Sequence, residues 1–191
     1  MAGQIIILNG APRSGKSSIA AAIQRSFAGI WVNLGVHASI TMTPEAYRPG
    51  IGLRPGGERP DLEPMVQKLY AALFDSIAAH SRTGLGVVCD FGVHDGYSRP
   101  LGIWEDLAAR LEGLPVLRVG VHCPLPAIMA RRNAEPRGGV YLGGDDVPEP
   151  VRRWQEAVHA GKIYDLTVDT SRLGPDDCAA AIAQWLAAGN P

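Results

Sequence analysis

A glycine-rich segment near the start of the chain carries the residues best suited to phosphate chemistry. Residues 10–17 read Gly-Ala-Pro-Arg-Ser-Gly-Lys-Ser and match the pattern Gly, any four residues, Gly-Lys-Ser/Thr at every fixed position. Such a loop turns successive backbone N–H groups toward one anion. Lys16 would bridge the β- and γ-phosphates, and the Ser17 hydroxyl suits Mg²⁺. The residues expected to hold ATP are Gly10, Ala11, Pro12, Arg13, Ser14, Gly15, Lys16, Ser17 and Ser18.

The segments on either side of the loop provide the setting that this motif requires. Residues 5–8 are Ile-Ile-Ile-Leu, a run typical of a strand buried on both faces. After the loop, apolar residues recur at helical spacing, at Ile19, Ala22, Ile23 and Phe27. The loop is therefore predicted to join a strand to a helix, whose N-terminus adds donors and a positive dipole end. This context makes a chance match the weaker explanation.

The rest of the chain alternates between apolar strands and amphipathic helices. Further strands are predicted over residues 29–36, 85–90, 115–122 and 164–170, and further helices over 61–81, 101–111, 127–133, 148–160 and 175–188. This alternation indicates an α/β fold with a parallel sheet and right-handed crossovers. The length of 191 residues favours one domain. Residues 43–60 are too rich in Pro and Gly for regular structure, and we expect a flexible loop on the acceptor side.

Two titratable residues follow strands at the edge where the phosphate loop must lie. The carboxyl ends of parallel strands form the ligand crevice of such sheets. Asp90 ends the strand predicted over 85–90 and is a candidate for a second metal ligand beside Ser17, or for a catalytic group. His37 follows the strand predicted over 29–36 and is a candidate base. A histidine that merely lines the crevice is the alternative. His94 and Asp95, after the third strand, are more simply explained as turn residues.

Residues 126–145 have the character of a small lid. Arg131 and Arg132 are adjacent on a short predicted helix, and Arg137 follows in a Pro- and Gly-containing stretch. Guanidinium groups near a phosphate site can neutralise the charge on a phosphoryl group in transfer. We therefore predict a catalytic role for Arg137 and for one of the adjacent pair. A solvated arginine face is the alternative.

Composition excludes several classes of partner. The net charge is −1 and there is no basic run, so nucleic acid and anionic membranes are not expected to bind. No apolar run approaches the ~18 residues of a membrane span. The first residues lead into the predicted strand without a basic or apolar leader, and we expect a cytoplasmic protein. The three cysteines are widely spaced and are interpreted as small buried hydrophobes.

Several of these blocks together resemble the chloramphenicol phosphotransferase family. They are Ile-Leu-Asn-Gly ahead of Ser-Gly-Lys-Ser, residues 31–36, 88–91 and 131–137, and Tyr-Asp-Leu-Thr-Val-Asp-Thr at 164–170. The resemblance covers nearly the whole chain in order. It implies a three-layer phosphate-loop fold with strand order 2-3-1-4-5. It also implies ATP and Mg²⁺ as cofactors, and phosphorylation of a hydroxyl on a small antibiotic.

One position departs from the family pattern. After the second strand the family has Gly-Val-Asp-Ser, with the Asp as the base for the acceptor hydroxyl, whereas this chain has Gly35-Val36-His37-Ala38. Imidazole is a competent base, so the resemblance implies that His37 takes this role, with a different geometry and a different acceptor. The expected function is an ATP-dependent small-molecule O-phosphotransferase. The alternatives are a kinase of a nucleoside or sugar acid, and a catalytically weak nucleotide-binding module.

Overall fold

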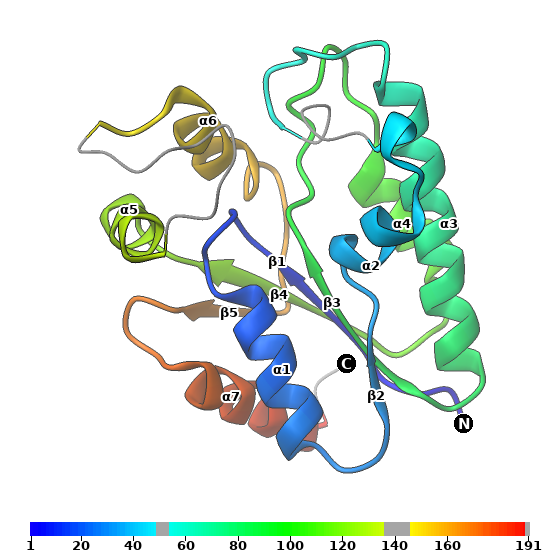
Figure 1. Ribbon diagram of the computed structural model, residues 1–191. Coiled ribbons are helices and arrows are strands. Elements are labelled where there is room, and N and C mark those ends of the chain that lie inside the picture. Colours follow the sequence, from blue (N-terminus) through cyan, green and yellow to red (C-terminus); the bar gives the residue numbers. More distant parts are fainter. Residues whose placement is uncertain (49–53, 136–145, 190–191) are drawn as a thin grey trace.

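The computed structural model describes residues 1–48, 54–135 and 146–189. Its five strands form one parallel sheet in the order β2-β3-β1-β4-β5, which confirms the predicted order (Figure 1). The strands are β1 Ile5–Asn9, β2 Trp31–Asn33, β3 Gly86–Phe91, β4 Val116–His122 and β5 Leu166–Asp169. Asn9, the last residue of β1, lies opposite Phe91 of β3 and Gly120 of β4. The carboxyl ends of the central strands therefore meet at one edge.

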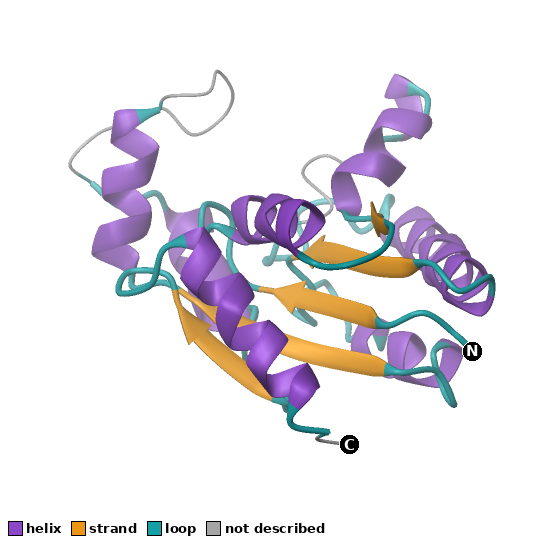
Figure 2. Ribbon diagram, turned by 90° about the horizontal axis from the view of Figure 1, so that it is seen from below, coloured by secondary structure: helices purple, strands orange, loops and turns teal. Residues whose placement is uncertain are grey.

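Helices cover both faces of this sheet (Figure 2). On one face, α1 (Lys16–Ser26) and α7 (Pro175–Ala187) pack against Ile6 and Leu8 of β1. On the other face, α3 (Glu63–Arg82) and α4 (Ile103–Arg110) pack against Ile5 and Ile7. Because neighbouring strand residues point to opposite faces, a strand covered on both sides must be apolar throughout. This explains the unbroken Ile-Ile-Ile-Leu run. Within the described ranges, no helix is both long and apolar enough to cross a membrane.

Two shorter helices stand beyond the carboxyl edge of the sheet, near the phosphate loop. They are α5 (Leu125–Ala134) and α6 (Glu149–Ala157), and α5 lies below α6 in Figure 1. A small apolar cluster joins them to the loop, with Ala11 packed among Cys123, Ile128 and Val158. The predicted lid over residues 126–145 thus includes α5, while residues 136–145 lie outside the described part of the chain.

The second strand is shorter than the one predicted over residues 29–36, and the second half of that prediction is wrong. β2 ends at Asn33, and α2 (Val36–Met42) follows almost at once. The side chain of Asn33 ends the strand, because its Oδ1 accepts a hydrogen bond from the N–H of Gly35 at 3.1 Å. In the predicted loop over 43–60, the described residues contain one 3₁₀ turn, Glu45–Tyr47, and residues 49–53 lie outside the description.

Candidate functional site

The phosphate loop joins β1 to α1 and has the backbone that its sequence requires. All nine residues predicted to hold the nucleotide lie at the end of β1, in the loop, or in the first turn of α1. Gly15 precedes α1 with φ of 94°, a conformation that glycine adopts without strain. No side chain caps α1, so its first N–H groups are left for an anion. The local structure therefore fits a nucleotide polyphosphate.

The Lys16 side chain lies across the mouth of this loop. Its Nζ donates hydrogen bonds to the Ala11 carbonyl oxygen at 2.8 Å and to Ser14 Oγ at 3.4 Å. Burial lowers the pKa of Lys16 to about 8, and the nearby Asp90 carboxylate opposes part of this shift. The ammonium group is thus desolvated and held by two neutral oxygens. An arriving phosphate would favour its charged form strongly.

Ser17 and Asp90, the two predicted metal ligands, are in direct contact. Ser17 Oγ donates a hydrogen bond to Asp90 Oδ2 at 2.5 Å. Asp90 is the penultimate residue of β3 and is only 8% exposed. A hydroxyl and a carboxylate are the hard oxygen donors that Mg²⁺ uses when it travels with nucleotide phosphates. The donor set therefore fits Mg²⁺, which Ser17 and Asp90 would hold.

The other side of the Asp90 carboxylate is covered by the start of α2. A Cβ placed on Gly35 would lie 1.6 Å from Asp90 Oδ1, so only glycine allows this approach. His37 is two residues farther on, in the first turn of α2, and its side chain is exposed. The backbone next to His37 thus lies near Asp90, at the carboxyl edge of the sheet. The structure shows no hydrogen bond from the imidazole to any residue in the described ranges.

The adjacent arginines of α5 face different surroundings. Arg131 donates from Nη1 to the Arg13 carbonyl oxygen at 3.2 Å and from Nη2 to the Thr170 carbonyl oxygen at 2.5 Å. Thr170 Oγ1 in turn donates to the Ser14 carbonyl oxygen at 2.7 Å. Arg131 and Thr170 therefore fasten the phosphate loop to the end of β5. Thr170 is missing from the predicted site, although its place at the end of a strand on the ligand edge is a usable signal.

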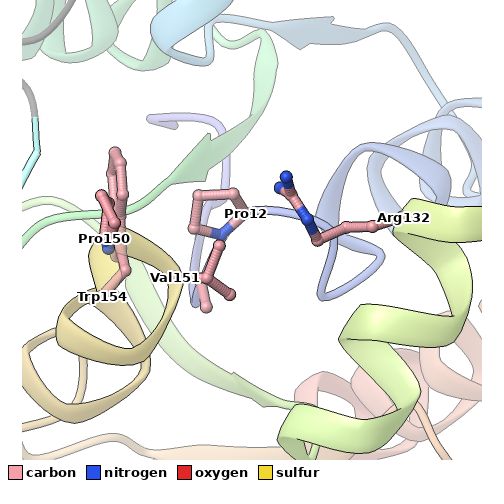
Figure 3. Close-up of a pocket in the computed structure, with 6 residues that line it drawn as sticks. Pro12, Arg132, Pro150, Val151 and Trp154 are labelled. Carbon is pink, nitrogen blue, oxygen red and sulfur yellow. The ribbon is translucent and has the colours of Figure 1, made fainter. Parts of the chain in front are cut away.

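Arg132 faces a pocket instead. Its side chain is buried, and its guanidinium extends from α5 toward Pro12 of the phosphate loop (Figure 3). The pocket is lined by Ala11, Pro12, Arg132, Pro150, Val151 and Trp154. Arg132 thus lies beside Ala11 and Pro12 of the loop, whereas Arg131 contacts the loop at Arg13. Arg137 lies outside the described residues.

A buried asparagine missing from the predicted site holds the surroundings of the loop together. Asn9 is fully buried and immediately precedes Gly10. Its Nδ2 donates to the Val158 carbonyl oxygen at 3.0 Å and to the Tyr164 hydroxyl at 2.9 Å, and its Oδ1 accepts from the N–H of Val93 at 2.7 Å. The amide thus ties the end of β1 to segments that follow β3 and α6. A polar residue at the end of an apolar strand is the only signal in the sequence.

Solved structures with a similar fold include kinases and a resistance protein. A sugar kinase from Janibacter sp. HTCC2649 has a TM-score of 0.65 and 17% identity, covering 96% of this chain and 94% of its own. A gluconokinase from Sinorhizobium meliloti 1021 has a TM-score of 0.62 and 17% identity, with coverages of 97% and 92%. The tunicamycin resistance protein of Deinococcus radiodurans has a TM-score of 0.60 and 18% identity, with coverages of 96% and 95%. At these identities the likeness establishes a shared fold and no more.

Sequence comparison gives a more specific result. Among curated proteins, none matches the chain significantly. A family model does match, over residues 3–187, which is nearly the whole chain. The chain belongs to the family of chloramphenicol phosphotransferase-like proteins.

Proposed function

We propose that this protein transfers the γ-phosphoryl group of ATP to a hydroxyl of a small molecule. The observation that carries the proposal is the contact of Ser17 with Asp90 at the mouth of a complete phosphate loop, beside Lys16. In the reaction, the acceptor oxygen bonds to the γ-phosphorus while the bond from that phosphorus to the bridging oxygen of ADP breaks. The hydroxyl proton passes to a base on the protein. Catalysis of this kind rests mainly on positioning and charge.

Each residue of the site then has a separate task. The N–H groups of the loop and Lys16 hold the β- and γ-phosphates. Ser17 and Asp90 would hold Mg²⁺, which when bound would neutralise charge on the phosphates. Arg132 offsets negative charge on the transferring phosphoryl group. When the acceptor is bound next to α2, His37 orients or deprotonates its hydroxyl. Arg131 acts indirectly, because its hydrogen bonds fix the loop backbone.

We propose an antibiotic as the acceptor, and hence a role in resistance or self-protection. Two findings support this choice: the description of the family, and the presence of the tunicamycin resistance protein among the similar folds. A second candidate is a kinase of a sugar acid or another primary metabolite. It is favoured by the similar sugar kinase and gluconokinase. His37 in place of the family Asp is compatible with either acceptor.

Acceptor-dependent release of ADP tests the proposal. The purified protein with Mg·ATP is offered chloramphenicol, tunicamycin, a nucleoside and gluconate, and the phosphorylated product is identified by phosphorus NMR. We expect turnover with an antibiotic hydroxyl and its loss in Lys16→Ala, because Lys16 supplies the positive charge between the β- and γ-phosphates. Lys68→Ala, on an exposed part of α3, is the matched control and should retain activity. Normal turnover by Lys16→Ala would contradict the assignment.

A further inference from the structure

The ring of Tyr164 lies on the sheet next to the strand that leads into the phosphate loop. A Cβ placed on Gly120 of β4 would lie 2.6 Å from Cδ2 of this ring, so the phenol needs a glycine beneath it. Gly120 is the register partner of Asn9 in β1, and the two residues therefore face the same side of the sheet. Trp104 of α4 contacts the phenol edge-on, with ring centroids 5.8 Å apart. The hydroxyl of Tyr164 is thus held beside the Asn9 amide.

The hydrogen bonds of this amide determine where the Tyr164 hydroxyl must donate. Asn9 Nδ2 has two hydrogens, and its two nearest acceptors are the Tyr164 hydroxyl at 2.9 Å and the Val158 carbonyl oxygen at 3.0 Å. The phenol oxygen therefore accepts from Asn9, and its own hydrogen must go elsewhere. Two acceptors are in reach, His159 Nδ1 at 2.9 Å and the Val158 carbonyl oxygen at 3.4 Å. The imidazole is the closer of the two, so the hydroxyl donates to His159.

His159 can accept this hydrogen only while its Nδ1 carries none. The imidazole must therefore be neutral, with its proton on Nε2. The pKa of His159 is lowered to about 4, mainly by burial, and charge on His122, Lys16 and Lys162 contributes to the shift. His122 stacks on the ring with centroids 4.0 Å apart, and Lys162 is itself paired with Asp95 at 3.6 Å. These surroundings keep His159 a hydrogen-bond acceptor at neutral pH.

We propose that Tyr164 and His159 are positioning residues for the phosphate loop: the neutral imidazole holds the hydrogen of the phenol, and the phenol oxygen holds the Asn9 amide ahead of Gly10. The inference rests on the proposed function, because the loop must bind Mg·ATP for its position to matter. Without the phenol, the Asn9 amide loses one of its three shortest hydrogen bonds. Without the imidazole, the phenol hydrogen turns to the Val158 carbonyl oxygen and competes there with Asn9. Either change loosens the start of the loop and weakens its hold on the phosphates.

Binding of the β,γ-imido analogue of ATP with Mg²⁺, measured by calorimetry, tests the role of Tyr164. Tyr164→Phe keeps the ring and removes the hydroxyl, and should raise the Kd about 3- to 10-fold, the usual effect of one lost hydrogen bond. Tyr70→Phe removes the hydroxyl of a buried tyrosine of α3, which packs against Phe74 and Phe91. It is the control and should leave the Kd unchanged. A lower Tm of Tyr164→Phe with an unchanged Kd would make Tyr164 a packing residue and overturn the proposal.

Substitutions of His159 separate an acceptor role from a packing role. His159→Asn places an amide oxygen near the position of Nδ1 and should bind the analogue within about twofold of the unsubstituted protein. His159→Leu has no acceptor and should bind about 2- to 5-fold more weakly. The double variant with Tyr164→Phe and His159→Leu should have the Kd of Tyr164→Phe alone, because both changes break the same chain of hydrogen bonds. Equal Kd values for His159→Asn and His159→Leu, or additive effects in the double variant, would overturn the proposal.

The imidazole also gives a spectroscopic test that needs no ligand. In NMR spectra of protein with ¹⁵N-labelled histidine, the His159 signals are the ones that disappear in His159→Leu. We expect a proton on Nε2 and none on Nδ1 between about pH 6 and pH 8, because the pKa of about 4 lies well below this range. A proton on Nδ1, or a change of charge on His159 within this range, would contradict the proposal.

The His159 substitutions lie at a half-buried position and keep the test decisive if Tyr164→Phe is poorly folded. The outcomes also separate this inference from the proposed function. If Tyr164→Phe weakens binding of the analogue but no acceptor is ever phosphorylated, the positioning role stands and the phosphotransferase function fails. If an acceptor is phosphorylated while Tyr164→Phe binds the analogue and turns over like the unsubstituted protein, the phosphotransferase function stands and the positioning role fails.

Discussion

Ser17 and Asp90 are 73 positions apart in the sequence, yet Ser17 Oγ lies 2.5 Å from Asp90 Oδ2. Ser17 is in the first turn of α1, and Asp90 is in β3, opposite Leu8 of β1. The parallel pairing of β1 with β3 thus brings the two oxygens together. In the proposed function, this hydrogen bond would hold both oxygens in place for a metal ion bound with the nucleotide.

The first prediction concerns this pair. Ser17→Ala and Asp90→Asn should each raise the Mg²⁺ concentration for half-maximal activity by about 10- to 100-fold, because each removes or weakens an oxygen ligand. Ser17→Thr keeps the hydroxyl and is the matched control. Activity is measured against Mg²⁺ at saturating ATP. An Asp90→Asn variant with unchanged Mg²⁺ dependence but an altered pH profile would instead identify Asp90 as the base.

The second prediction concerns Gly35, which allows α2 to begin against Asp90. Gly35→Ala should displace the carboxylate, because the new Cβ would lie 1.6 Å from Oδ1. We expect a loss of activity and of Mg²⁺ affinity similar to that of Asp90→Asn, and a loss of about 1–3 kcal/mol in unfolding free energy.

Gly174→Ala is a close control for this variant. Gly174 precedes α7 with φ of −69° and ψ of 166°, nearly the backbone of Gly35 at −71° and 174°. A Cβ there would meet only Asp177 Oδ2, at 3.4 Å. Equal effects of the two substitutions would show that Gly35 matters only as a helix cap.

The motif in the sequence was sufficient to predict the phosphate loop, and the positions of strand ends placed Asp90 near it, whereas the strand order was implied by the resemblance to the family. The sequence was insufficient at α2. A short apolar run such as residues 29–36 has no periodicity that separates strand from helix, and the Asn33 turn decides the outcome. The roles of Arg131 and Arg132 were also undetermined. Adjacent helical residues point in different directions, and only the packing of α5 on the loop shows which direction each takes.

The third prediction separates the two arginines of α5. Arg132→Ala should lower kcat by about 10²-fold or more with little change in nucleotide Kd, as expected when a donor to the transferring group is lost. Arg131→Ala should weaken nucleotide binding and lower Tm, because the loop loses its tie to Thr170. Arg152→Ala, an exposed arginine of α6, is the control. The reverse pattern, with kcat sensitive to Arg131, would exchange the two roles.

The fourth prediction uses the lowered pKa of Lys16. In the free protein this pKa is about 8, and bound phosphate should raise it. Above pH 8, binding must therefore take up a proton, and the Kd for Mg·ATP should rise by up to about tenfold per pH unit. Calorimetry at pH 8.5 in two buffers of different ionisation enthalpy measures the uptake. It should vanish in Lys16→Met. Proton uptake that persists in Lys16→Met would assign the effect to another group.

The lowered pKa of Lys16 also makes the free energy of unfolding depend on pH. The Lys16 pKa is lower in the folded protein than its ordinary value of 10.5. Between pH 8 and pH 10.5 the unfolded chain holds more protons, so this group makes the folded state more stable as pH rises. The free energy of unfolding, measured with urea at several pH values between 8 and 10.5, should rise less steeply with pH in Lys16→Met than in the unsubstituted protein. A larger slope in that variant would contradict the assignment.

The last prediction concerns His37, where the chain departs from its family. If the imidazole is the base, His37→Ala should lower kcat by about 10²–10⁴-fold, the ordinary contribution of a general base. Added imidazole should restore part of that activity, since the exposed position on α2 leaves room for it. Met42→Ala, exposed on the same helix, should be unaffected and serves as the control.

His37→Asp restores the family residue and makes this test directional. A carboxylate loses its proton at lower pH than an imidazole, so kcat/KM of His37→Asp should reach its plateau at lower pH than that of the unsubstituted protein. Chloramphenicol should also become a better acceptor, because the family geometry is rebuilt at this position. A variant series that changes only the acceptor KM, with no rescue by imidazole and no movement of the pH profile, would make His37 a wall of the acceptor pocket. Asp90, which already touches both Ser17 and the start of α2, would then be the leading candidate for the base.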